Sequence, residues 1–149
     1  MTRILAQAVT AASPDRAFDY RADPASIPEW NSTYPRVEST VGDPGVVGSQ
    51  FTLVRVNGRL LKTSVVEAER PRRLVTESVQ NGIKLRLTTE FTAVAAGTRV
   101  DAAYEYRVPW SRGGPIADRF LRRHIEGGLR ASTGELARRL DGGAGRGAG

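Results

Sequence analysis

The sequence predicts an α+β fold in which a curved, seven-stranded antiparallel sheet wraps around one long C-terminal helix. Residues 37–108 read as a succession of short strands, and two of their turns, Asn57-Gly58 and Asn81-Gly82, are typical of β-hairpins. Residues 114–140 form the longest segment with apolar residues at helical spacing. Because one face of such a sheet must be covered, and this helix is the only element large enough, we expect the sheet to fold around it.

A first strand and two short helices precede this region. Residues 3–10 have the mixed polarity of a half-exposed strand. Ser13-Pro14 is a typical helix start, because serine caps the first turn and proline fits the first helical position. Asp23-Pro24 repeats the pattern and begins a second, shorter helix. We therefore expect two short helices between the first and second strands.

Six further strands are expected, each bounded by a turn rich in glycine, asparagine or proline. Their predicted ranges are 37–41, 49–56, 60–68, 73–79, 83–93 and 98–108. With the other elements they make a single domain over residues 1–141. The remaining segment, 142–149, is glycine and alanine with one arginine, so we expect it to be a disordered tail.

The long helix carries two apolar stripes that differ in phase. The first stripe consists of Ile116, Ala117, Phe120, Leu121, His124 and Ile125. The second consists of Leu129, Ser132, Leu136 and Leu140. The Gly127-Gly128 pair separates them. We expect the first half of the helix to roof a cavity, with the only histidine of the chain facing it, and the second half to pack on the sheet as core.

Composition excludes several classes of function. The chain has 149 residues, a net charge of +6, one histidine and no cysteine, which excludes disulfides and thiolate chemistry and disfavours a metal site. No segment approaches the roughly 18–20 apolar residues of a membrane span, and the first residues do not resemble a signal peptide. The arginine clusters lie on no nucleic-acid-binding motif. We expect a cytoplasmic monomer or homodimer that uses no cofactor or metal and does not bind nucleic acid.

Several short segments, mostly caps and turns, share a pattern with a known family. They are Ser13-Pro14-Asp15, Pro28-Glu29-Trp30, Val47-Gly48-Ser49, Val65-Val66-Glu67 and Gly97-Thr98-Arg99-Val100. This set resembles the polyketide cyclase/dehydrase-like families of the helix-grip superfamily, which includes START domains and the birch-pollen-allergen fold. The resemblance implies a cavity between sheet and long helix, entered near the two short helices and the loop before the long helix. The superfamily includes cyclases, aromatases and lipid carriers, so the resemblance implies a fold rather than one activity.

Strand alternation predicts which side chains face this cavity. In 83–93 the inward residues are Ile83, Leu85, Leu87, Thr89 and Phe91. In 98–108 they are Val100, Ala102, Tyr104, Tyr106 and Val108. In 60–68 the alternation places Glu67 inward, unless a bulge turns it out. In 49–56 and 73–79 the alternation does not decide between the faces, so Arg55 and Glu77 fit either side.

The candidate site residues follow from this list and from the expected mouth of the cavity. The candidates for catalysis are His124, Tyr104, Tyr106 and Arg55. The candidates for substrate binding are Trp30, Asn31, Tyr34, Glu67, Glu77, Leu85, Leu87, Thr89, Phe91, Trp110 and Phe120. Each has a plainer alternative: the tyrosines as core aromatics, Trp30 as a packing anchor, the glutamates and Arg55 as surface residues, and His124 as a residue hydrogen-bonded at the rim.

Two functions from different classes fit these residues. The first is a cofactor-free cyclase, aromatase or dehydratase acting on a hydrophobic polyketide or related intermediate. His124 would move protons, because imidazole does so near neutral pH, and the tyrosines and Arg55 would donate to carbonyl and enolate oxygens. The second is a carrier or sensor that binds a hydrophobic small molecule or quinone-like lipid without converting it.

Overall fold

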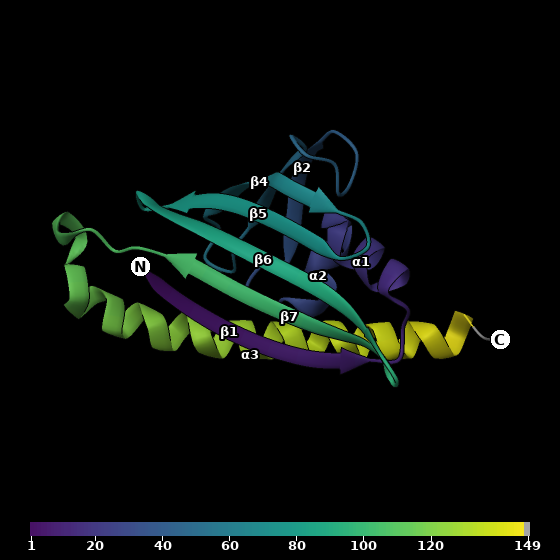
Figure 1. Ribbon diagram of the computed structural model, residues 1–149. Coiled ribbons are helices and arrows are strands. Elements are labelled where there is room, and N and C mark those ends of the chain that lie inside the picture. The colour runs from purple at the N-terminus through teal and green to yellow at the C-terminus, as the bar shows by residue number, and fades with distance from the viewer. Residues whose placement is uncertain (148–149) are drawn as a thin grey trace.

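The computed structural model describes the backbone of residues 1–147 and contains one seven-stranded antiparallel sheet with a long helix packed on one face (Figure 1). The strands are β1 (Thr2–Thr10), β2 (Arg36–Val41), β3 (Gln50–Val54), β4 (Leu60–Glu69), β5 (Arg73–Gln80), β6 (Ile83–Val94) and β7 (Gly97–Tyr106). The helices are α1 (Pro14–Ala22), η1 (Pro24–Ser26), α2 (Ile27–Trp30), η2 (Trp110–Arg112) and α3 (Gly114–Gly147). The predicted fold class is confirmed, including the two short helices between β1 and β2.

The strand order is β1-β7-β6-β5-β4-β3-β2. The first two strands of the chain therefore form opposite edges of the sheet, and α1, η1 and α2 connect them. The helix starts are those the sequence predicts. The Ser13 hydroxyl accepts a hydrogen bond from the Arg16 backbone N–H at 3.3 Å, and the Asp23 carboxylate accepts one from the Ala25 N–H at 3.0 Å.

Two turns depend on residues that can adopt positive φ angles. Asn81 and Gly82, between β5 and β6, both have positive φ angles, 52° and 77°, as in a type I′ hairpin turn. Gly97, at the start of β7, has a φ of 138°, and a Cβ there would collide with the backbone carbonyl of Thr10. These turns fix the register of β5 with β6 and of β6 with β7, and so decide which side chains of these strands face α3.

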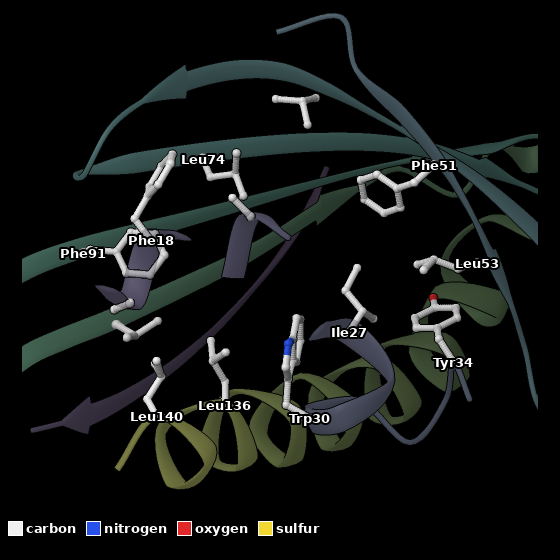
Figure 2. Packing of buried hydrophobic residues seen from close by; sticks show 14 of the residues in the cluster. Phe18, Ile27, Trp30, Tyr34, Phe51, Leu53, Leu74, Phe91, Leu136 and Leu140 are labelled. Carbon is white, nitrogen blue, oxygen red and sulfur yellow. The ribbon is translucent and has the colours of Figure 1, made fainter. Parts of the chain in front are cut away.

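The second stripe of α3 is buried against the sheet, as predicted, but three of its residues also line a cavity that was predicted beneath the first stripe: Leu129, Ser132 and Leu136. Leu129, Leu136 and Leu140 are at most 5% exposed. Figure 2 shows Leu136 and Leu140 below the aromatic residues that enter from α1 and the sheet. The Phe18 and Phe91 rings meet edge to face there, with centroids 5.7 Å apart. This half of α3 therefore holds the helix on the sheet.

The first stripe of α3 is only partly used. Leu121 and Ile125 are half-buried, but Ile116 and Phe120 are 74% and 73% exposed. The first turns of α3 extend past the end of the sheet in Figure 1, so these side chains have no strand beneath them. At its other end α3 continues to Gly147, well into the segment 142–149 predicted as a tail, and residues 148 and 149 lie outside the described range.

Replacing Leu136 with alanine should lower the free energy of unfolding by about 2–5 kcal/mol, because the change leaves a void between α3 and the sheet. The matched control is Leu5→Ala on the outer face of β1, where the side chain is 62% exposed and the loss should be within about 0.5 kcal/mol. Urea denaturation measures both. Similar losses for the two variants would contradict the packing described here.

Candidate functional site

A cavity with two lobes lies between the sheet and α3. The outer lobe has a volume of about 160 Å³ and opens to solvent, and the inner lobe has a volume of about 60 Å³. The lobes lie next to each other because they share six lining residues: Asn31, Tyr34, Leu85, Tyr104, Leu129 and Ser132. A ligand could therefore enter at the mouth and extend inward beneath the helix.

Polar side chains from three elements surround the outer lobe. His124 comes from α3, Asn31 follows α2, and Arg55 follows β3. The His124 side chain is exposed, so it stands at the mouth and not deep in the cavity. The Arg55 side chain is half-buried, and its Nε is buried without a hydrogen-bond partner among the described residues. An unpaired donor of this kind is available to a ligand oxygen.

Tyr34 and Tyr104 stand where the two lobes meet. Burial raises the pKa of the Tyr104 phenol well above its usual range, and the neighbouring Tyr34 adds to this rise, while Arg21 and Arg55 oppose it. Burial likewise raises the pKa of Tyr34, with Arg55 acting against it. Both phenols are therefore protonated at neutral pH. They can donate hydrogen bonds to a ligand but cannot serve as bases.

The inner lobe contains a charged residue that sequence reasoning missed. Arg21, in the last turn of α1, is only 5% exposed, and its guanidinium carbon lies 5.0 Å from the centroid of the Trp30 ring. Burial lowers its pKa to about 10, so the group remains charged at neutral pH. A signal existed in the sequence: Arg21 lies three and four residues after the buried Phe18 and Ala17, on the same helical face.

Several predicted residues do come together around this cavity. His124 and Arg55 line the outer lobe, while Trp30, Leu87 and Thr89 line the inner lobe. Asn31, Tyr34, Leu85 and Tyr104 line both lobes. Trp30 also has the packing role considered for it, because its indole N–H donates to the Ser26 hydroxyl at 3.1 Å.

Two predicted residues face inward but lie in the core and not on the cavity wall. Phe91 packs against Phe18, as described above. Tyr106 is 2% exposed and packs with Ile4 and Leu129 between β1 and α3. Burial raises its pKa above the usual range, and the Asp118 carboxylate raises it further. The inward facing of both residues is as predicted, but neither borders the space where a ligand would sit.

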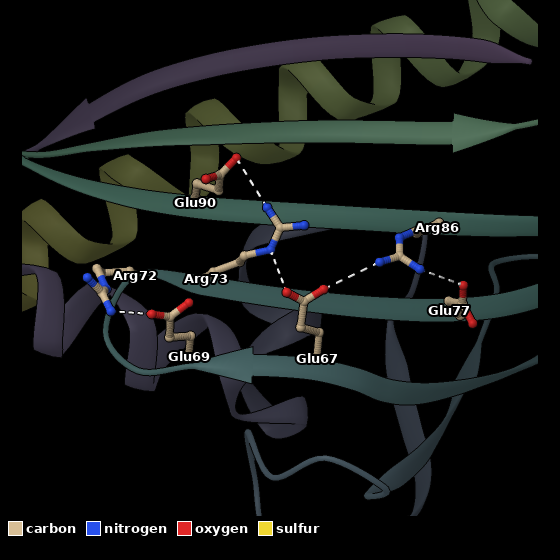
Figure 3. Close-up of polar contacts among 7 residues, drawn as sticks. All are labelled: Glu67, Glu69, Arg72, Arg73, Glu77, Arg86 and Glu90. Carbon is tan, nitrogen blue, oxygen red and sulfur yellow. Dashed lines mark hydrogen bonds and ion pairs between the residues drawn. The ribbon is translucent and has the colours of Figure 1, made fainter.

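Glu67 and Glu77 lie on the outer face of the sheet, which corrects their assignment to the cavity. A register shift between Val65 and Glu67 turns the end of β4 over, the bulge considered as an alternative. Figure 3 shows both carboxylates in a ladder of ion pairs across β4, β5 and β6. Glu67 pairs with Arg73 at 3.0 Å and with Arg86 at 3.4 Å, and Glu77 pairs with Arg86 at 3.2 Å.

Trp110 and Phe120 are also outside the cavity, which corrects their placement at its mouth and wall. Trp110 is 81% exposed in η2, and Phe120 is 73% exposed on the overhanging turns of α3. Both positions follow from the way α3 begins beyond the end of the sheet.

The side chains around the cavity are not a metal-binding set. None of the described residues that line either lobe is acidic. Groups of three or more His, Cys, Asp or Glu residues placed to hold a metal ion are absent from the described part of the chain. Among the described helices, none combines the length and apolar character needed to cross a membrane.

Comparisons with known proteins agree with this architecture. The family described as "Polyketide cyclase / dehydrase and lipid transport" matches residues 1–141. No curated protein matches the chain.

Three solved structures illustrate the likeness. A protein from Rhodobacter sphaeroides is 21% identical, with 97% of this chain and 93% of that chain covered and a TM-score of 0.68. A protein from Nitrosomonas europaea is 13% identical, with 96% of each chain covered and a TM-score of 0.72. The di-domain ARO/CYC StfQ from the steffimycin biosynthetic pathway is 14% identical, with 96% of this chain and 51% of that chain covered and a TM-score of 0.74. At these identities the likeness shows a shared fold.

The phenols should resist ionisation while the protein is folded. All four tyrosines have raised pKa values; for Tyr20 the value is about 12, through burial and then the Glu29 carboxylate. Because tyrosine ionises near pH ~10 in an unfolded chain, the protonated phenols stabilise the fold below that pH. This contribution is lost as the pH rises through the native pKa values.

A pH titration that follows phenolate absorbance together with circular dichroism measures this effect. We expect phenolate to appear well above the pH range of free tyrosine, at the same pH as loss of structure. Normal ionisation of Tyr34 and Tyr104 in a protein that remains folded would contradict their burial in the cavity.

Proposed function

Because the chain belongs to the polyketide cyclase/dehydrase and lipid transport family, we propose that it closes a ring in a hydrophobic, polycarbonyl compound and removes water from it. The observation that carries this proposal is the outer lobe, where His124 and Arg55 surround the same space as two protonated phenols. These side chains supply one group that can carry protons and several hydrogen-bond donors for substrate oxygen atoms. Apolar residues of the lining, such as Leu85 and Leu129, would exclude water.

The proposed reaction has three steps and is redox-neutral. A base removes a proton from a carbon next to a carbonyl group, and the resulting enolate carbon attacks a second carbonyl of the same molecule. A carbon–carbon bond forms, and the attacked oxygen takes up a proton. Loss of this hydroxyl with a neighbouring hydrogen releases water and leaves a double bond, so the atoms balance without a further reactant.

Each residue would act on a defined atom in these steps. His124 would take the carbon-bound proton and pass it to the attacked oxygen, since imidazole exchanges protons near neutral pH. In the loss of water it would take the neighbouring hydrogen as a proton and give it to the leaving hydroxyl. Tyr34 and Tyr104 would donate hydrogen bonds to the enolate and alkoxide oxygens as charge develops on them. Arg55 would stabilise the same charge, with its unpaired Nε as the donor. Folding the substrate in a narrow cavity would supply the orientation.

A second function, a carrier without turnover, is favoured by one observation. The His124 side chain is exposed, and the groups deeper in the cavity, Tyr34, Tyr104, Arg21 and Arg55, are donors at neutral pH. A cavity with donors only would bind a carbonyl-bearing hydrophobic molecule but would not deprotonate it. Enzyme and carrier therefore differ in whether His124 reaches the bound compound.

Turnover of a synthetic triketone with a phenyl group at one end distinguishes these functions, because ring closure and water loss convert it to a phenol that absorbs in the ultraviolet. His124→Ala should lower kcat by about 100-fold or more while the affinity for the triketone stays within a few-fold, as expected for a lost proton carrier. Tyr104→Phe should lower kcat by a similar factor through loss of an oxyanion donor.

Tyr20→Phe and Arg59→Met are the matched controls, because both side chains lie outside the cavity. Both should keep the activity of the unaltered protein. If the unaltered protein binds the triketone and never accelerates its conversion, the carrier function replaces the enzyme. If His124→Ala keeps full turnover, His124 has no role in proton transfer.

A further inference from the structure

The Arg21 guanidinium is a buried positive charge that the proposed reaction does not use. It lies in the inner lobe, 95% shielded from bulk solvent, with the Trp30 ring on one side. The ion pairs of the described residues lie elsewhere on the molecule, and none of them includes Arg21. The neighbours that act on it, the Trp30 ring and the Tyr104 phenol, carry no charge at neutral pH.

Such a charge is costly to bury without a counter-ion. An ion taken out of water loses its hydration, and an aromatic ring restores only part of that loss. The outer face of the same sheet shows the contrast, since Arg73 and Arg86 each have carboxylate partners there. An arginine that is kept charged, buried and unpaired beside an open space is arranged for an anion that comes from outside the protein.

The surroundings of Arg21 are suited to the oxygen atoms of such an anion. Four hydroxyl side chains from β4, β5 and β6 line the inner lobe: Thr63, Thr76, Ser78 and Thr89. All four are buried, and the Thr63 hydroxyl oxygen has no hydrogen-bond partner among the described residues. This second unpaired group comes from a different element and lines the same lobe as Arg21. The apolar side chains of the lobe, such as Leu61 and Val100, would hold the body of the ligand.

We propose that the inner lobe binds the carboxylate of a hydrophobic carboxylic acid, with Arg21 as its counter-ion and the Thr63 hydroxyl as a further donor. The planar guanidinium can give two parallel hydrogen bonds to the two oxygens of a carboxylate. No acidic side chain among the described residues that line either lobe competes for Arg21. This inference rests on the proposed function for its site and adds the chemical class of the ligand.

The direction of binding follows from the position of Arg21. The carboxylate lies beside Arg21 in the inner lobe, so the opposite end of the ligand extends toward the outer lobe, which Arg55 and His124 line. A chain still tethered to a carrier through its carboxyl carbon must leave that carbon outside. The ligand is therefore a free acid that an earlier hydrolysis has released.

Naphthoate and naphthamide of the same ring isomer test this inference by calorimetry. The two compounds have nearly the same shape and differ in charge. The unaltered protein should bind the acid at least about tenfold more tightly than the amide, since a charge-assisted pair replaces a neutral contact. Arg21→Met should abolish this preference, and Arg21→Lys should restore part of it. Arg107→Met removes an exposed arginine outside both lobes and should keep the preference.

Thermal unfolding without ligand gives a second readout. Because Arg21→Met removes an uncompensated buried charge and keeps the length of the side chain, it should raise Tm by about 5 °C. If Arg21 instead stabilises the fold, Arg21→Met should lower Tm. Failure of Arg21→Met to fold, or a lower Tm with the acid preference intact, would therefore overturn the inference.

The outcomes separate this inference from the proposed function. Equal affinity of the unaltered protein for acid and amide overturns the carboxylate site alone, and turnover of the neutral triketone still stands. If the unaltered protein binds neither naphthalene compound and also leaves the triketone unconverted, both the carboxylate site and the proposed function are wrong.

Discussion

The packing of α3 on the inner face of the sheet is the interaction on which the rest of the molecule depends. Leu136 and Leu140 close the sheet at one end of the helix, where Phe18 and Phe91 fill the space beneath them. Toward the other end the helix is covered less completely, and Leu121 and His124 border the outer lobe of the cavity. One helix therefore has two roles: its last turns hold it on the sheet, and its middle, from Leu121 to Thr133, lines the cavity.

Charge is distributed differently on the two sides of the sheet. The outer face pairs arginine with glutamate across three strands, so its charges are neutralised in contact with water. The cavity on the inner side has Arg21 from α1 and Arg55 from the residues after β3, and no lining carboxylate among the described residues. A cavity whose charged side chains are all positive destabilises the protein without a ligand and favours the binding of an anionic or carbonyl-rich ligand.

Much of this fold could be predicted from the sequence because its signals are local. Ser13-Pro14 and Asn81-Gly82 fix a helix start and a hairpin by their own chemistry, and the alternation in β6 and β7 placed Leu85 and Tyr104 on the inner face. The wrong predictions concern side chains whose facing depends on contacts with residues far away in the sequence. The bulge in β4 reversed Glu67, and the overhang of α3 left Phe120 in solvent, two effects of tertiary geometry that residue spacing does not contain. Arg21 was overlooked because an arginine in a short helix is ordinarily exposed.

The two indole N–H groups offer the most direct test of where a ligand binds. The protein has two tryptophans: Trp30 lines the inner lobe beside Arg21, and Trp110 is exposed on η2. In a nuclear magnetic resonance titration with naphthoate, we expect the Trp30 indole signal to shift and saturate while the Trp110 signal stays in place. A shift of Trp110 with Trp30 unchanged would place the ligand on the overhanging end of α3 and contradict a binding site between the helix and the sheet.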